Sequence, residues 1–198
     1  MKILTLLQAG LGAALLTLTI SSSAMTAPAA EPAPPAPTYS QNEIVNKAAD
    51  FFGSTTEGLA RAVERVFSEK GSPNGYIMGV EGGGAVVVGL RYGDGDLFMK
   101  ANGDRPAKVY WQGPSVGFDF GGNASKVFVL VYNLPNTEAI YQRFPGVEGS
   151  AYLIAGVGVN YQQNGRIILA PMRTGVGLRA GANIGYLHYS KERNILPF

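Results

Sequence analysis

The spacing of apolar residues changes once along the chain. Before residue 71 apolar side chains recur every three to four positions, and Leu59, Val63, Val66 and Phe67 share one face. This spacing predicts an amphipathic helix that packs on a core. A helix lying on a membrane would carry more lysine and arginine than this segment, in which glutamates offset the basic residues. The pattern therefore favours core packing over membrane contact.

Two N-terminal helices are expected, each with a start signal. Ser40 with Glu43, and Ser54 with Glu57, have the Ser-x-x-Glu spacing of a capping box, in which each side chain bonds the other residue's amide. A glycine suited to a helix C-terminus follows each segment, at Gly53 for the first.

From Tyr76 onward the period is two, which is typical of strands. Strands are predicted over residues 76–80, 84–91, 96–100, 108–112, 116–120, 126–132, 150–161, 166–169, 175–183 and 184–189. Turn signals rich in glycine and asparagine separate several of them. Residues 134–146, which contain prolines near both ends, predict one short helix.

Glycine suggests how these strands assemble. The chain has 27 glycines among 198 residues, about twice the usual share of 7%. In segments 150–161 and 175–183, glycines gather on one face and branched apolar residues on the other, which favours strong curvature. We therefore predict a mainly β fold: a small closed antiparallel β-barrel of about nine or ten strands, with two N-terminal helices and one short internal helix. A β-sandwich is the structural alternative.

The stretch "EGGGAVVVGL", from Glu81 to Leu90, resembles a phosphate-binding loop only in its glycines. Such a loop needs a following lysine and hydroxyl residue, and it opens into a helix. Here strand-forming valines follow instead. The glycines are therefore expected to form a bend between two strands, and no nucleotide is expected.

The N-terminal segment predicts export. Residues 1–30 combine a basic start, an apolar run and small residues, as a secretory signal peptide does, with cleavage after Ala24 or near Ala29 or Ala30. An uncleaved anchor is the alternative. Residues 31–39 form a proline-rich linker, and residues 40–198 a periplasmic β-barrel domain.

Composition removes several classes of function. The chain has no cysteine, which excludes disulfides, thiolate metal sites and cysteine nucleophiles. With 16 basic and 14 acidic residues and no basic stripe, nucleic-acid binding is not expected.

No catalytic constellation stands out. His188 is the one histidine, so a histidine metal site is impossible and a hydrolytic triad would rest on this residue alone. Asp94 and Asp96 flank a glycine and are expected in a hairpin turn rather than a calcium loop. We expect no enzyme activity, no metal and no cofactor. A hydrolase acting on peptidoglycan or lipopolysaccharide stays the alternative that depends on His188.

Aromatic residues provide the candidate ligand-binding residues. Trp111, Phe118, Phe120, Phe128 and Tyr132 lie on or near predicted strands. They are hypothesised to line a cavity inside the barrel, as in small lipid-binding barrels. Plain core filling is the alternative.

The order of these segments resembles a known family. "YIMGVEGGGAVVVGLRYGDGD", "YWQGPSVGFDFGGNASKVFVLVYN", "NTEAIYQRF" and "GVGVNYQ" are similar to the SYLF lipid-binding domain. Residues 39–198 more closely resemble the envelope integrity protein A family of alphaproteobacteria. The resemblance implies a small periplasmic β-barrel related to lipid-binding domains that supports the cell envelope, with no catalytic residues to transfer.

The expected function is that of a non-catalytic periplasmic protein that supports cell-envelope integrity by binding a lipid or another envelope component. An integral outer-membrane β-barrel with a structural role is the alternative, since the strands alternate and the chain ends at Phe198. The short strands before residue 120 and the amphipathic helix weigh against it.

Overall fold

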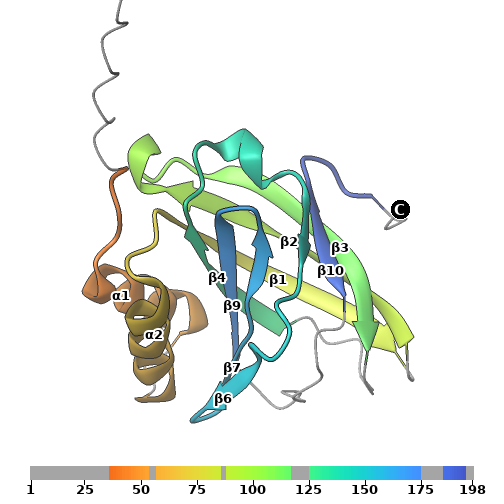
Figure 1. Ribbon diagram of the computed structural model, residues 1–198, viewed down its shortest axis with the longest axis horizontal. Coiled ribbons are helices and arrows are strands. Elements are labelled where there is room, and N and C mark those ends of the chain that lie inside the picture. Colours follow the sequence, from red (N-terminus) through yellow and green to blue (C-terminus); the bar gives the residue numbers. More distant parts are fainter. Residues whose placement is uncertain (1–35, 54–56, 86–87, 117–124, 175–184, 195–198) are drawn as a thin grey trace, which may run out of the picture. The chain divides into compact units, whose positions relative to one another are not determined.

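Two helices precede a curled antiparallel sheet (Figure 1). A computed structural model of the chain describes residues 36–53, 57–85, 88–116, 125–174 and 185–194. The helices are α1 (Gln41–Phe52) and α2 (Glu57–Lys70). Within the described ranges, no helix combines the length and the apolar run that crossing a membrane would require. The predicted signal peptide and most of the linker lie outside the described residues.

Ten strands form one sheet in the described residues. They are β1 (Gly75–Ala85), β2 (Val88–Met99), β3 (Ala107–Val116), β4 (Ser125–Tyr132), β5 (Arg143–Pro145), β6 (Tyr152–Ile154), β7 (Val157–Val159), β8 (Gln162–Asn164), β9 (Ile167–Thr174) and β10 (Tyr186–Ser190). Neighbours follow the order β5-β10-β3-β2-β1-β4-β9-β7-β6, and β8 pairs with β9 outside this path. Two short 3₁₀ helices, η1 (Lys100–Asn102) and η2 (Thr137–Ile140), lie in connections.

The start and end of α1 confirm the prediction for this helix. The Ser40 hydroxyl accepts the Glu43 amide at 3.3 Å, and the Glu43 carboxylate accepts the Ser40 amide at 2.9 Å. Gly53 ends the helix with φ 87°, a conformation that favours glycine. The Ser54 half of the second capping box lies outside the described residues.

We expect Ser40→Ala to lower the free energy of unfolding by about 1 kcal/mol, because the amide of Glu43 loses its side-chain acceptor. Urea unfolding followed by circular dichroism measures this change. Ser72→Ala, at another exposed serine, is the matched control and should leave stability within about 0.5 kcal/mol of wild type. An unchanged Ser40→Ala midpoint would show that the cap does not contribute.

The first hairpin is longer than predicted. The glycines at 82–84 do not form a bend: they lie inside β1 and pair with residues 90–92 of β2. The predicted turn at Asp94 is equally wrong, because β2 runs without interruption from Val88 to Met99. Glycine signalled a turn in the sequence, but Gly93 and Gly95 are needed because the Trp111 ring and a neighbouring strand come too close for a side chain.

Three other predicted segments need correction. β3 is continuous through Pro114, which lies beyond Gln112, the last residue paired with β10 in the described chain. Residues 150–161 form the β6–β7 hairpin instead of one strand, because Ala155 and Gly156 both have positive φ, as a tight hairpin turn requires. Residues 134–146 contain η2 and β5 rather than one helix, since pairing with β10 outweighs local helix preference.

The sheet is an open, curled half-barrel. The ladder path ends at β5 on one side and β6 on the other. An isolated bridge joins Gly146, next to β5, to Gln162 of β8. The prediction of a mainly β, antiparallel fold with two helices is confirmed, whereas closure into a complete barrel is not.

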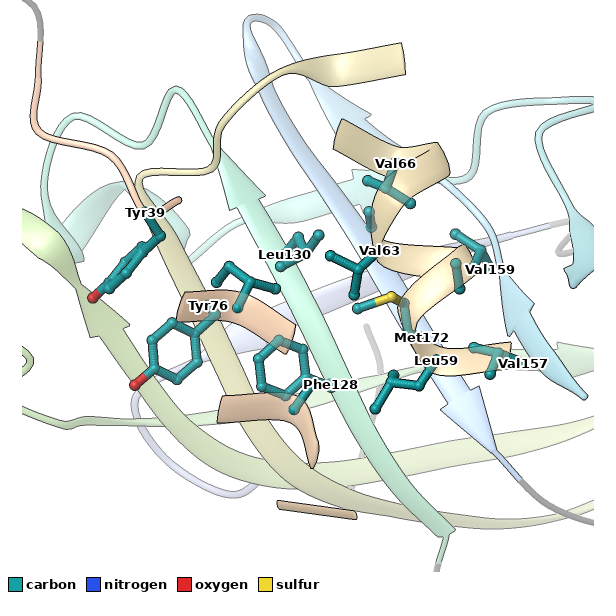
Figure 2. Packing of buried hydrophobic residues seen from close by; sticks show 14 of the residues in the cluster. Tyr39, Leu59, Val63, Val66, Tyr76, Phe128, Leu130, Val157, Val159 and Met172 are labelled. Carbon is teal, nitrogen blue, oxygen red and sulfur yellow. The ribbon is translucent and has the colours of Figure 1, made fainter. Parts of the chain in front are cut away.

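Both faces of the central strands are buried. In β4, odd-numbered residues Val127 and Val129 lie on one face, and even-numbered Phe128 and Leu130 on the other, all of them almost inaccessible. The even-numbered set joins the outer core, where α1 and α2 cover the convex face (Figure 2). The outer core includes Tyr39, Leu59, Val63, Val66, Tyr76, Phe128, Leu130, Val157, Val159 and Met172.

The odd-numbered set belongs to a second cluster, the inner core, on the concave face. The inner core consists of Ile77, Leu97, Met99, Val109, Trp111, Val127, Val129, Val131, Leu134, Ile140, Phe144, Ile167, Leu169, Leu187 and Tyr189. Because seven strands contribute to it, the inner core is what the curled sheet wraps around.

Candidate functional site

The concave face becomes charged toward one end of the sheet. Along β1 the inward positions pass from Ile77 through Gly79 to Glu81, and along β9 from Leu169 to Arg173. β4 lies between the two strands and pairs with both, so that their inward residues project from the same face of the sheet at a similar level. An acidic and a basic side chain 92 positions apart therefore meet on the inner side of the sheet.

Glu81 lies at the centre of this site and is only 7% exposed. Its carboxylate accepts hydrogen bonds from Nε of Arg173, from Nη2 of Arg173 at 3.2 Å and from Nε1 of Trp111 at 3.3 Å. The Arg173 guanidinium also donates to Oδ1 of Asn160 at 2.9 Å. We call Glu81, Trp111, Asn160 and Arg173 the Glu81 cluster.

Both charged members of the Glu81 cluster remain ionised. Burial raises the pKa of the Glu81 carboxyl, but the charges of Arg173 and Arg91 and the hydrogen bonds outweigh it, so its pKa lies below the ordinary value. Burial lowers the pKa of Arg173, but the Glu81 charge more than compensates, and the net shift is upward. The pair is thus a buried salt bridge at neutral pH.

Glycines make room for the tryptophan of the Glu81 cluster. A Cβ atom on Gly93 would lie 2.1 Å from Cε2 of Trp111, and one on Gly79 would lie 2.6 Å from its Cη2. Neither distance is possible for a real side chain. The Trp111 ring therefore lies directly on two adjacent strands, where it is 2% exposed and its N–H reaches Glu81.

Asn160 has a hydrogen-bonding group without a partner. A guanidinium can only donate, so the Asn160 atom that faces Arg173 must be the oxygen. The amide nitrogen, Nδ2, is then left buried with no partner in the described chain. A buried donor without an acceptor costs about 1–3 kcal/mol, so such a group calls for a functional explanation.

The five aromatic residues proposed from sequence do not form one lining. Trp111 belongs to the inner core and to the Glu81 cluster. Phe128 and Tyr132 lie in the outer core beneath the helices, on the opposite face of the sheet. Phe118 and Phe120 lie outside the described residues. Of the three candidates that the structure describes, Trp111 alone reaches the charged site.

The other candidates for chemistry lie elsewhere. His188, on β10, has Gln112 and Arg143 as its register partners and alternates with the inner-core residues Leu187 and Tyr189. Asp94 and Asp96 lie on β2 and pair with Lys108, at 2.9 and 3.9 Å. In the described ranges, no three His, Asp or Glu side chains gather in a way that could hold a metal ion.

Sequence reasoning missed Glu81, Asn160 and Arg173. One signal was available: Glu81 has the same strand parity as the apolar Ile77, so extending the predicted strand by one residue would have placed a charge at an inward position. The partner of that charge could not be found in the same way, because it depends on which strands become neighbours.

Comparison with known proteins gives consistent results. A crystal structure of a β-barrel-like, uncharacterized protein from Brucella abortus is similar, with 51% sequence identity and a TM-score of 0.74, over 81% of this chain and 99% of that one. A search of curated proteins found no match. The profile that describes envelope integrity protein A matches residues 37–198. Since every helix and strand of the described residues lies inside that match, the chain belongs to the envelope integrity protein A family.

Proposed function

We propose that the protein supports the integrity of the cell envelope without catalysis, by binding a lipid or another envelope component in the periplasm. The family suggests the envelope role. The observation that most supports binding is the Glu81 cluster, where a buried donor of Asn160 has no partner among the described residues. Protein interiors rarely keep such groups without a reason.

A binding role agrees with the chemistry of the site better than turnover does. Both Glu81 oxygens already accept hydrogen bonds from cations or an indole, and its pKa is low, so the carboxylate is a poor general base. His188 alternates with the inner-core residues and is not part of the Glu81 cluster. A hydrolase that depends on His188 therefore gains no support.

An integral outer-membrane barrel is also less favoured. Such a barrel presents an apolar band to lipid on its outer face. Here the outward residues of β1, β4 and β9 pack under α1 and α2. With the predicted signal peptide of residues 1–30, this arrangement favours an exported protein that osmotic shock would release without detergent.

We further propose that the sheet closes between β5 and β8. Besides the Gly146–Gln162 bridge, Nδ2 of Asn164 donates to the backbone oxygen of Arg143 at 2.9 Å and to Oε1 of Gln142 at 2.8 Å. These contacts join the two sides of the curl. Closure would separate the inner core from solvent all round.

The test combines a cellular and a molecular measurement. Deletion of the gene is expected to increase sensitivity to detergents and to antibiotics that act on the cell wall, with restoration by the wild-type gene. Native mass spectrometry of protein purified from the periplasm is expected to show an additional mass that solvent extraction removes. Unchanged sensitivity together with no bound component would contradict the proposal.

A further inference from the structure

We infer that the Glu81 cluster binds an oxyanion, a carboxylate or phosphate group, through Nδ2 of Asn160 and the remaining N–H groups of Arg173. This inference rests on the proposed binding function and specifies the chemistry of the ligand.

The hydrogen bond that Asn160 lacks is one in which its side chain would be the donor. Asn160 is 5% exposed and its Oδ1 accepts from Arg173 at 2.9 Å, so the group left over is a donor. Neither solvent nor a described side chain satisfies it. A ligand that completes Asn160 must therefore supply an acceptor.

Arg173 adds further donors at the same place. A guanidinium has five N–H bonds. Three of them point to Glu81 and Asn160. Within the described ranges the other two N–H bonds of this largely buried side chain have no acceptor, and a planar guanidinium suits the paired oxygens of carboxylates and phosphates.

The acceptor oxygens of the cluster, by contrast, each already have a donor. Glu81 receives two hydrogen bonds from Arg173 and one from Trp111. The groups of the cluster that still lack partners are thus donors, and a ligand that completes the cluster must supply acceptors. A neutral ligand that mainly donates hydrogen bonds would leave Nδ2 of Asn160 without a partner.

Arginine side chains also bring positive charge to the site, which favours an anionic ligand. Arg91 faces the same side of β2 as Gly93, and its charge acts on both Glu81 and Tyr189. Arg173 and Arg91 thus both place positive charge near Glu81. In a largely desolvated place, positive charge of this kind favours an anionic group.

Calorimetry with wild-type and variant protein tests the inference. The probes are inorganic phosphate, acetate, and vesicles of phosphatidylglycerol or of neutral phosphatidylcholine. Asn160→Ala removes the donor, and Asn160→Asp also adds a negative charge that repels an anion. Asn46→Asp, at an exposed position of α1, adds the same charge elsewhere and is the matched control.

We expect an anionic probe to bind wild type saturably. The dissociation constant should rise about tenfold in Asn160→Ala and further in Asn160→Asp, and should change less than about twofold in Asn46→Asp. Circular dichroism verifies that each variant is folded; if Asn160→Asp does not fold, Asn160→Ala decides. Binding of free phosphate or acetate identifies a small anion, and binding of phosphatidylglycerol vesicles alone identifies a lipid headgroup.

Equal binding of neutral and anionic vesicles, or anion affinity that Asn160→Ala leaves unchanged, would overturn the inference. A buried water that alone satisfies Asn160 would give this second result. If native mass spectrometry still finds the co-purified component on Asn160→Asp, binding stands and only the oxyanion assignment fails. If no component co-purifies and no probe binds, both proposals fall.

Discussion

Gly93→Val is expected to lower the free energy of unfolding by about 3–5 kcal/mol or to prevent folding. The new Cβ would lie 2.1 Å from Cε2 of Trp111, so the ring must leave its place between the strands. Displacing a buried tryptophan costs about as much as deleting it. Urea unfolding followed by far-ultraviolet circular dichroism measures the loss.

Two variants separate this collision from a general effect of replacing glycine. Gly149→Ala, where nothing lies within 4 Å of the new Cβ, should cost only about 1 kcal/mol from its positive φ. Combining Gly93→Val with Trp111→Leu should cost less than the sum of the two single changes, because the smaller side chain removes the collision. Strictly additive losses would mean that Gly93 is not needed for the ring.

Arg173→Met is expected to destabilise the protein by about 3–5 kcal/mol at neutral pH, since it leaves the Glu81 charge buried without its main partner. The loss should shrink as the pH falls. Without Arg173, burial raises the pKa of Glu81, and a carboxyl whose folded-state pKa is raised favours the folded state only where it is protonated. Unfolding curves across a range of pH provide the measurement.

The controls for Arg173→Met are a second change and an exposed arginine. Replacing both members, Glu81→Leu with Arg173→Met, should recover most of the stability because no unpaired charge remains. Arg61→Met, whose side chain is 62% exposed and pairs with Glu57, should change stability by less than about 1 kcal/mol. A double variant as unstable as Arg173→Met alone would show that the cost is one of packing.

Local signals predicted the parts of the fold that local contacts decide. The capping box at Ser40, the glycine end of α1 and the apolar face of α2 all depend on residues a few positions apart, and the structure has them as expected. Strand β4, buried on both faces, was also found, because a continuous apolar run is enough to predict it.

The wrong strand and turn predictions arise where a glycine can serve more than one structural role. In the first hairpin, glycines that resembled turns lie within β1 and β2, and one of them, Gly93, lies beneath Trp111. At Ala155 and Gly156 the opposite occurred: a tight turn was hidden within a segment predicted as one strand. Whether a glycine turns the chain or accommodates a neighbour depends on a contact that is distant in sequence.

The same limit explains the candidate site. Aromatic alternation led to Trp111 but also to Phe128 and Tyr132, which lie on the other face of the sheet. Glu81 and Arg173 meet only because β1 and β9 both pair with β4. The periodicity of one sequence does not reveal which strands become neighbours in the sheet.

The fluorescence of Trp111, the one tryptophan of the chain, tests most directly whether the ligand binds at the Glu81 cluster. Its indole N–H already contacts Glu81, so an anion at Arg173 and Asn160 should change the emission saturably, with the affinity that calorimetry gives. Asn160→Ala should shift that titration to higher concentration. Binding seen by calorimetry with no change in Trp111 emission would place the ligand elsewhere and contradict this account.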